Sequence, residues 1–428
     1  MRIHFDLVGC RVNEAEIESM AARAAELGHE AAADPGAADW IVVNTCSVTR
    51  EAERDSRQKI RRAHARNPGA GIAVTGCWST LDPERAATLP GVARVIANAE
   101  KDNLIPEILG RSDGASISSP PARRRTRAYI KVQDGCSNQC AYCVTRLARG
   151  PLRSRPAGGV VRDILAAQRA GAREAVLAGV HLGAWGKDLG IADGLEELVE
   201  TVLARTAVPR VRLSSLEPWD IRPGFFRLWR DGRLCPHLHL PLQSGSASTL
   251  ARMKRNAMPE DFARLADTAR AAIPDLALTS DWMVGFPGET EAEFRESAAF
   301  VERMGFARLH VFRFSPRPGT EAASMNGAVT APEIRRRAEL ARHAADAAAE
   351  KYMRAFLGRE MDVLWEADTR CGMRRGLTAN FLRVRVKSDT IEPNTITRVK
   401  LTSADCTEMV GELPSVRTPR QHAESGLC

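Results

Sequence analysis

The sequence predicts an α/β protein of three parts: an amino-terminal parallel βα domain, an incomplete (βα)6 barrel of the TIM type, and a small carboxyl-terminal antiparallel β-barrel. Strand-like apolar runs alternate with amphipathic helical segments through residues 1–355, which favours parallel pairing. Beyond that point the apolar runs are short and separated by Gly, Asn, Asp and Pro, a pattern typical of small antiparallel barrels. We expect the domain boundaries at residues 1–112, 122–355 and 356–420.

Composition places this chain of 428 residues among ordinary globular proteins of two or three domains, with 44% hydrophobic and 27% charged residues. No apolar run is long enough to cross a membrane, and the amino terminus lacks the pattern of a signal peptide. Ten cysteines, several of them clustered, then favour a metal-binding protein of the reducing cytoplasm over a disulfide scaffold. The net charge of +8 suggests a polyanionic partner.

The amino-terminal block reads as alternating strands and helices. Strands are expected at Ile3–Val8, Trp40–Asn44 and Gly71–Thr75, with helices at Glu14–Leu27 and Arg50–Ala65 between them. Such a succession predicts parallel βαβ units.

Each of these three strands is followed directly by a cysteine: Cys10, Cys46 and Cys77. Side chains after the carboxyl ends of parallel strands gather at one edge of the sheet, so the three thiols can converge although they are far apart in sequence. A three-thiolate site is therefore predicted here. The alternative is three unrelated buried cysteines, because cysteine often packs as a small apolar residue.

Residues 111–121 are rich in Ser, Gly and Pro and read as a linker. Six strand candidates follow, most of them separated by helical segments, which suits an open barrel with its functional residues on the loops after the strands. The candidates are Ala128–Val132, Glu174–Ala178, Arg210–Leu213, His237–Leu240, Leu276–Met283 and Leu309–Phe312.

The first barrel loop carries Cys136, Cys140 and Cys143 in the pattern Cys-x3-Cys-x2-Cys. Structural zinc sites and ferredoxin-type clusters use four protein ligands, so three thiolates suggest a metal site with one open position. An open position can bind a substrate or cofactor. The remaining cysteines lack a spacing typical of ligands; they are Cys235, Cys371, Cys406 and Cys428.

The other barrel loops carry polar residues where a nucleoside-like cofactor could bind. These candidates are Tyr142, His181, Ser215, Glu217, Gln243 and Gly285. The alternative is that the Ser-Gly and Gly-Pro segments are ordinary loop residues. His237 and His239 alternate on one strand and are interpreted as hydrogen-bonded core residues, not as metal ligands.

A long helix is expected at about Ala331–Ala355, followed by strand-like runs at Val363–Trp365, Phe381–Val386 and Val399–Leu401. Basic residues gather in two stretches of the chain. Residues 123–155 hold nine basic residues and one acid, and residues 370–388 hold six basic residues and no acid. Such patches suit phosphate contacts, although a solvated basic face is the alternative. We single out Arg374, Arg375, Arg383 and Arg385 as candidate RNA contacts.

The Cys136–Cys143 motif, with an aromatic residue just before its last cysteine, resembles the signature of radical S-adenosylmethionine (SAM) enzymes. The order of domains resembles the methylthiotransferase branch of that family over nearly the whole chain. Local matches are most similar to the tRNA threonylcarbamoyladenosine methylthiotransferases. They are Asn44–Thr49, Ser56–Arg62, Gly179–Asp188 and Leu234–Gln243.

This resemblance implies two 4Fe-4S clusters, one on each cysteine triad, with SAM bound at the open iron of the barrel cluster. It implies hydrogen abstraction by a 5′-deoxyadenosyl radical, a route suited to an unactivated adenine carbon that acid–base groups cannot deprotonate. The implied reaction adds a methylthio group to carbon 2 of N6-threonylcarbamoyladenosine at position 37 of tRNA. We expect no protein acid or base to be needed, because the cofactors carry the chemistry.

The implied partners are tRNA, bound in part by a carboxyl-terminal barrel resembling the TRAM domain, and an electron donor of the flavodoxin or ferredoxin type. Alternatives within the family are methylthiolation of isopentenyladenosine in tRNA or of a ribosomal-protein aspartate. A non-catalytic iron–sulfur or zinc-holding RNA-binding protein is the alternative from another class.

Overall fold

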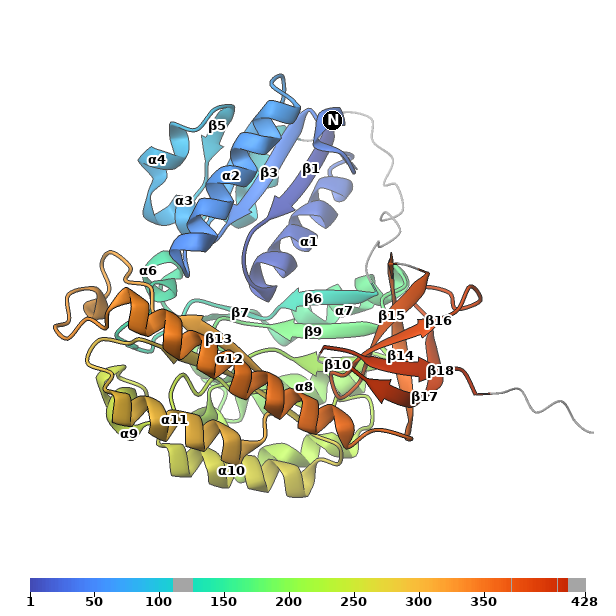
Figure 1. Ribbon diagram of the computed structural model, residues 1–428. Coiled ribbons are helices and arrows are strands. Elements are labelled where there is room, and N and C mark those ends of the chain that lie inside the picture. Colours follow the sequence, from blue (N-terminus) through green and yellow to red (C-terminus); the bar gives the residue numbers. More distant parts are fainter. Residues whose placement is uncertain (111–125, 371, 406, 415–428) are drawn as a thin grey trace, which may run out of the picture.

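The computed structural model describes residues 1–110, 126–370, 372–405 and 407–414 (Figure 1). Some of the predictions fall outside the described residues. They concern the linker, the domain boundaries near 112, 122 and 420, and the residues Arg123, Arg124, Arg125, Cys371, Cys406 and Cys428. No described helix combines the length and the apolar character needed to cross a bilayer.

The amino-terminal domain is a five-stranded parallel sheet in the order β2-β1-β3-β4-β5. Apolar side chains on both faces of the sheet pack against the helices. The three predicted strands are confirmed, and β2 and β5 are short edge strands that were not predicted. The elements are β1 (Arg2–Leu7), α1 (Arg11–Glu26), β2 (Glu30–Ala31), β3 (Trp40–Thr45), α2 (Arg50–Arg66), β4 (Gly71–Gly76), α3 (Cys77–Leu81), α4 (Pro83–Ala87), β5 (Val92–Val95) and α5 (Leu104–Leu109).

The central domain confirms the predicted six-stranded open barrel. Two parallel three-stranded sheets, β10-β9-β6 and β11-β12-β13, are joined by single parallel bridges between Val211 and Leu234 and between Ser215 and His239. The strands are β6 (Arg127–Lys131), β9 (Glu174–Ala178), β10 (Arg210–Leu213), β11 (His237–His239), β12 (Ala277–Val284) and β13 (Arg308–Arg313), with a small hairpin of β7 (Gln133–Asp134) and β8 (Arg153–Ser154). The helices are α6 (Thr145–Arg149), α7 (Ala157–Arg169), α8 (Gly194–Arg205), α9 (Ala247–Arg252), α10 (Pro259–Ala272), α11 (Glu291–Met304) and α12 (Ala331–Arg354).

The amino-terminal domain lies across the open side of this barrel (Figure 1). On one edge, Glu18 of α1 accepts a hydrogen bond from the backbone N–H of Tyr129 in β6. On the other edge, Arg317, beyond the end of β13, forms an ion pair with Glu53 of α2. A barrel with two unpaired edge strands is thereby closed by a neighbouring domain instead of by further strands.

The carboxyl-terminal domain is a closed barrel in the order β14-β15-β16-β18-β17. Its strands are β14 (Glu360–Arg370), β15 (Met373–Thr378), β16 (Arg383–Lys387), β17 (Ile396–Ala404) and β18 (Met409–Glu412). The prediction of a purely antiparallel barrel is corrected at one pair, because β16 and β18 run parallel where the sheet closes. Arg210 and Arg212 of β10 anchor it by donating hydrogen bonds to the carbonyl oxygens of Leu377 and Ala379.

Candidate functional site

The loop after β6 presents Cys136, Cys140 and Cys143, all half-buried, at the carboxyl end of the barrel. The backbone N–H of Cys143 donates to the carbonyl oxygen of Cys140 (3.1 Å), which curls the loop. Gly135 has φ +67°, and a Cβ there would lie 1.9 Å from the carbonyl oxygen of Pro151, so only glycine fits before the first cysteine. A cavity of about 60 Å³ is lined by Cys140 and Cys143.

His181, a predicted site residue in the loop after β9, lies against the first thiol. Its Nδ1 is 3.7 Å from Cys136 Sγ, and its Nε2 is 2.5 Å from Asp220 Oδ2. Burial lowers the pKa of His181, but the bonds to Asp220 and Cys136 outweigh burial and raise it to about 9. The carboxylate thus fixes the orientation of a ring that touches the triad.

Glu217, another predicted residue, is held by Arg255, which the sequence did not single out. Arg255 Nη2 donates to Glu217 Oε2 (2.7 Å), and its Nη1 lies 4.0 Å from Cys140 Sγ. The guanidinium also lies 4.7 Å from the Trp219 ring centroid. This pair presents a carboxylate and a cation beside the cysteine loop, which suits the polar groups of a nucleoside or amino-acid cofactor.

The remaining predicted cofactor residues are spread around the rim of the barrel. Gln243 adopts φ +76°, and its buried Oε1 has no hydrogen-bond partner among the residues that the structure describes. Ser215 bridges to the end of β11, and Tyr142 packs edge-on against Phe286. Gly285 packs against α12, where a Cβ would lie 2.5 Å from Ile334 Cγ1.

The second triad forms as the order of the strands predicts. Cys10 precedes α1, Cys46 follows β3 and Cys77 begins α3, so all three lie at one edge of the amino-terminal sheet. A Cβ on Gly9 would come within 3.1 Å of Cys46 Cβ, which shows how closely the first two loops approach. Burial, together with the neighbouring thiols of Cys10 and Cys77, raises the pKa of Cys46 to about 12.

An interface ion network joins the two domains beside the second triad; its charged members are Glu16, Lys101, Lys131, Asp134 and Arg149. Arg149 Nη1 donates to Glu16 Oε1 of the amino-terminal domain and to Asp134 Oδ1 of the barrel, both at 2.8 Å. Arg149 and Glu16 are only 4% and 3% exposed. Burial would raise the pKa of Glu16, but Arg149 and the two lysines hold it well below its usual range.

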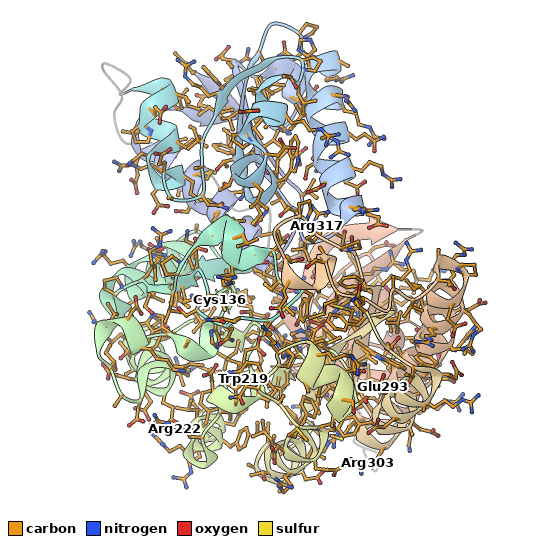
Figure 2. All side chains as sticks on the ribbon, turned by 90° about the vertical axis from the view of Figure 1, so that its left-hand side faces the viewer. Cys136, Trp219, Arg222, Glu293, Arg303 and Arg317 are labelled. Carbon is orange, nitrogen blue, oxygen red and sulfur yellow. The ribbon has the colours of Figure 1, made fainter. Side chains whose placement is uncertain are left out.

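Short links connect this network to the thiols. Arg149 Nη2 donates to Asn13 Oδ1 (2.7 Å), and Asn13 Oδ1 lies 3.7 Å from Cys10 Sγ. Asn98 Nδ2 donates to the carbonyl oxygen of Ala148 (2.8 Å) and lies 3.9 Å from Cys77 Sγ. The residues that pack the two domains together therefore also touch the second triad. Figure 2 shows Cys136 within the barrel and Arg317 where the blue amino-terminal domain meets it.

Each triad offers three soft thiolate donors next to a cation, Arg255 for one and Arg149 for the other. This donor set suits an iron–sulfur cluster. Within the described residues, no group of three or more His, Cys, Asp or Glu is arranged to hold a single metal ion. A cluster of several irons can bridge thiolates that are farther apart than the ligands of one zinc ion.

The predicted RNA-contact arginines divide into two pairs. Arg375 and Arg385 are neutralised by Glu408 (3.0 Å) and Asp405 (2.8 Å) respectively. Arg374 donates to the hydroxyl of Thr369, and Arg383 is exposed. Among the described residues Arg374 and Arg383 form no ion pair, so they remain the cations best placed to meet phosphate.

Comparison with known families divides the chain as the fold does. Residues 2–97 match the "Uncharacterized protein family UPF0004", and residues 130–301 match the "Radical SAM superfamily". The threonylcarbamoyladenosine tRNA methylthiotransferase MtaB of Thermotoga maritima is 37% identical over 89% of this chain and 90% of its own length. The ribosomal protein uS12 methylthiotransferase RimO of a Roseiflexus species is 32% identical over 86% of this chain and 85% of its own.

Among solved structures, the radical SAM methyltransferase TsrM of Kitasatospora setae, bound to cobalamin and a [4Fe-4S] cluster, superimposes with a TM-score of 0.54 at 14% identity. The match covers 75% of this chain and 77% of that one. At this identity the similarity concerns the fold alone.

Proposed function

Because this chain belongs to the radical SAM methylthiotransferases, we propose that it adds a methylthio group to carbon 2 of N6-threonylcarbamoyladenosine at position 37 of tRNA. The observation that supports this most directly is the pair of cysteine triads, one on the amino-terminal sheet and one on the barrel, in two domains that the interface ion network holds together. A reaction that both removes a hydrogen atom and delivers sulfur needs two such sites close to one substrate.

The enzyme uses SAM and 4Fe-4S clusters. We assign one cluster to Cys136, Cys140 and Cys143 and the other to Cys10, Cys46 and Cys77. When bound, these cofactors supply the one-electron chemistry, the sulfur and the methyl group of the reaction. The residues of the chain hold the cofactors in position. His181, oriented by Asp220, contacts Cys136, and the Arg255–Glu217 pair provides polar contacts for SAM.

Exclusion of water is the second contribution of the protein. The amino-terminal domain covers the open side of the barrel and buries Arg149 and Glu16 between the two domains. A reactive radical is thereby shielded from solvent. We assign no general acid or base, because the hydrogen on an adenine carbon is removed as an atom and not as a proton.

The partners follow from this chemistry. tRNA contacts are assigned to the TRAM-like carboxyl-terminal barrel, with Arg374 and Arg383 as phosphate-binding cations. Reduction of a cluster requires an electron donor, for which a flavodoxin or ferredoxin is proposed. A tRNA substrate and such an electron donor together point to a cytoplasmic enzyme.

The test is a methylthiolation assay on anaerobically reconstituted protein with SAM, a reductant and tRNA that carries threonylcarbamoyladenosine. Mass spectrometry of the digested nucleosides should show the 2-methylthio product, and the Cys136→Ser variant should not form it. Parallel reactions offer isopentenyladenosine tRNA and the ribosomal protein uS12. If a methylthio product forms on isopentenyladenosine tRNA or on uS12 and not on threonylcarbamoyladenosine tRNA, that substrate takes the place of the proposed one. If no SAM is cleaved, a non-catalytic RNA-binding protein is favoured.

A further inference from the structure

The inner face of the barrel carries charged and polar side chains near the start of β13. Arg308 is in register with Thr279 of β12, and His310 is in register with Asp281. Partners in register on neighbouring parallel strands share one face, and the alternate residues, such as Leu278 and Leu309, belong to the apolar core under the helices. Arg308 and His310 therefore lie on the inner face.

Arg11 of the amino-terminal domain reaches the same region. It begins α1 directly after Cys10, and its guanidinium carbon lies 5.9 Å from the ring centroid of Phe381. Phe381, held at φ +68°, stacks on His237 of β11 with the ring centroids 4.3 Å apart. A side chain next to a cysteine of the second triad thus extends toward the lining of the barrel.

Three acids of this region already have basic partners. Glu174 pairs with Arg212 (2.7 Å), Asp281 with His239 (3.4 Å), and Glu366 with Arg127. Among the described residues, Arg11 and Arg308 form no ion pair.

A chain of contacts connects the two cations. Phe381, over which Arg11 lies, stacks on His237, and His237 Nε2 is 3.1 Å from the hydroxyl oxygen of Thr279, the register partner of Arg308. Burial, Arg383 and Arg11 lower the pKa of Arg308, in that order. Half-buried cations that repel one another are stabilised by an anion between them.

We propose that Arg11 and Arg308 bind the carboxylate of the threonylcarbamoyl group of the substrate and thereby select this nucleoside over isopentenyladenosine. This inference rests on the proposed function. An apolar isopentenyl group would leave both cations desolvated and unpaired, and a site built for a charge rejects an analogue that lacks it. Because Arg11 adjoins Cys10, the contact would also fix the nucleoside beside the second triad.

The experiment compares two anticodon stem-loops, one with threonylcarbamoyladenosine and one with the methyl ester of its carboxylate. The wild type should prefer the free acid in kcat/KM by about ten- to hundredfold, the range expected for a hydrogen-bonded charge. Arg308→Met and Arg11→Met should lose that preference through KM, and Arg308→Lys should recover part of it. Exposed Arg342, changed to Met, is the matched control.

Three measurements distinguish a misfolded variant, a wrong proposed function and a wrong assignment of the carboxylate. Iron content and SAM cleavage without RNA should equal those of the wild type in every variant, which excludes a folding or cluster defect. A wild type inactive on the free acid overturns the proposed function itself. Equal activity of the wild type on the two stem-loops overturns the assignment of the carboxylate to Arg11 and Arg308. An equal loss of activity on both stem-loops in the variants, as expected for a contact to a tRNA phosphate, also overturns it.

Discussion

At the scale of single residues, the interface ion network is the feature with the largest energetic consequence. Arg149 makes hydrogen bonds to both domains, and each of its carboxylate partners is buried. Removing one partner of a buried charge pair leaves the other charge unpaired in a medium of low dielectric constant, at a cost of about 3–5 kcal/mol.

The Arg149→Met variant is therefore expected to be markedly less stable than the wild type. Its thermal unfolding midpoint, measured by calorimetry on the reconstituted protein, should fall by at least about 5 °C. Arg303→Met is the matched control, because Arg303 and Glu260 form an exposed pair of little energetic value. Equal midpoints for the wild type and Arg149→Met would contradict the structural role assigned to the network.

The sequence singled out the six cysteines that we assign as cluster ligands but not the residues that contact them. Cysteine positions after strands carry a local signal, because the strands and their order can be read from apolar periodicity. Arg149 and Glu16 are 133 residues apart, so their contact exists only once the two domains dock. Arg255 and Glu217 are likewise 38 residues apart, and no sequence pattern predicts that they pair.

At the scale of elements, the strands that the sequence did predict in the first two domains lie within about two residues of the observed ones, because apolar residues mark each of them. The short edge strands β2 and β5 were not predicted, because they bury little apolar surface. β15 was missed because it carries Arg374, Arg375 and Gly376. The barrel requires that glycine, since a Cβ there would lie 2.5 Å from Val363 Cγ1. The parallel pairing of β16 and β18 could not be predicted from the sequence either. It results from the closure of the barrel and not from the residues of either strand.

Two cations of β15 and β16, the half-buried Arg374 and the exposed Arg383, give a prediction for RNA binding. The Arg374→Glu/Arg383→Glu variant should bind tRNA at least tenfold more weakly, and the slope of log K against log salt should fall by about 2, near one unit per phosphate contact. Arg375 and Arg385 are less suitable targets because each already pairs with an acid.

Fluorescence titration at several salt concentrations measures both quantities. Arg398→Glu on β17 is the control, because Arg398 is exposed on a strand that pairs with neither β15 nor β16. An unchanged salt slope in the double variant would mean that another surface holds the tRNA.

At the scale of the whole molecule, function depends on one domain closing another. The open side of the barrel is covered by a domain that brings its own cysteine triad, and the same contacts that hold the domains together also border the second site. The second triad lies wholly within the amino-terminal domain, so docking brings a complete triad to the barrel. The net charge of +8 agrees with a polyanionic substrate approaching this assembly.

Each triad is assigned its own cluster, and a count of iron and acid-labile sulfide per chain tests that assignment. Three anaerobically reconstituted proteins are compared: the wild type, Cys136→Ala/Cys140→Ala/Cys143→Ala, and Cys10→Ala/Cys46→Ala/Cys77→Ala. We expect the wild type to hold two 4Fe-4S clusters per chain and each triple variant to hold one, with a distinct electron paramagnetic resonance signal left in each. A wild type with a single cluster, or with zinc in place of iron, would contradict the two-site account.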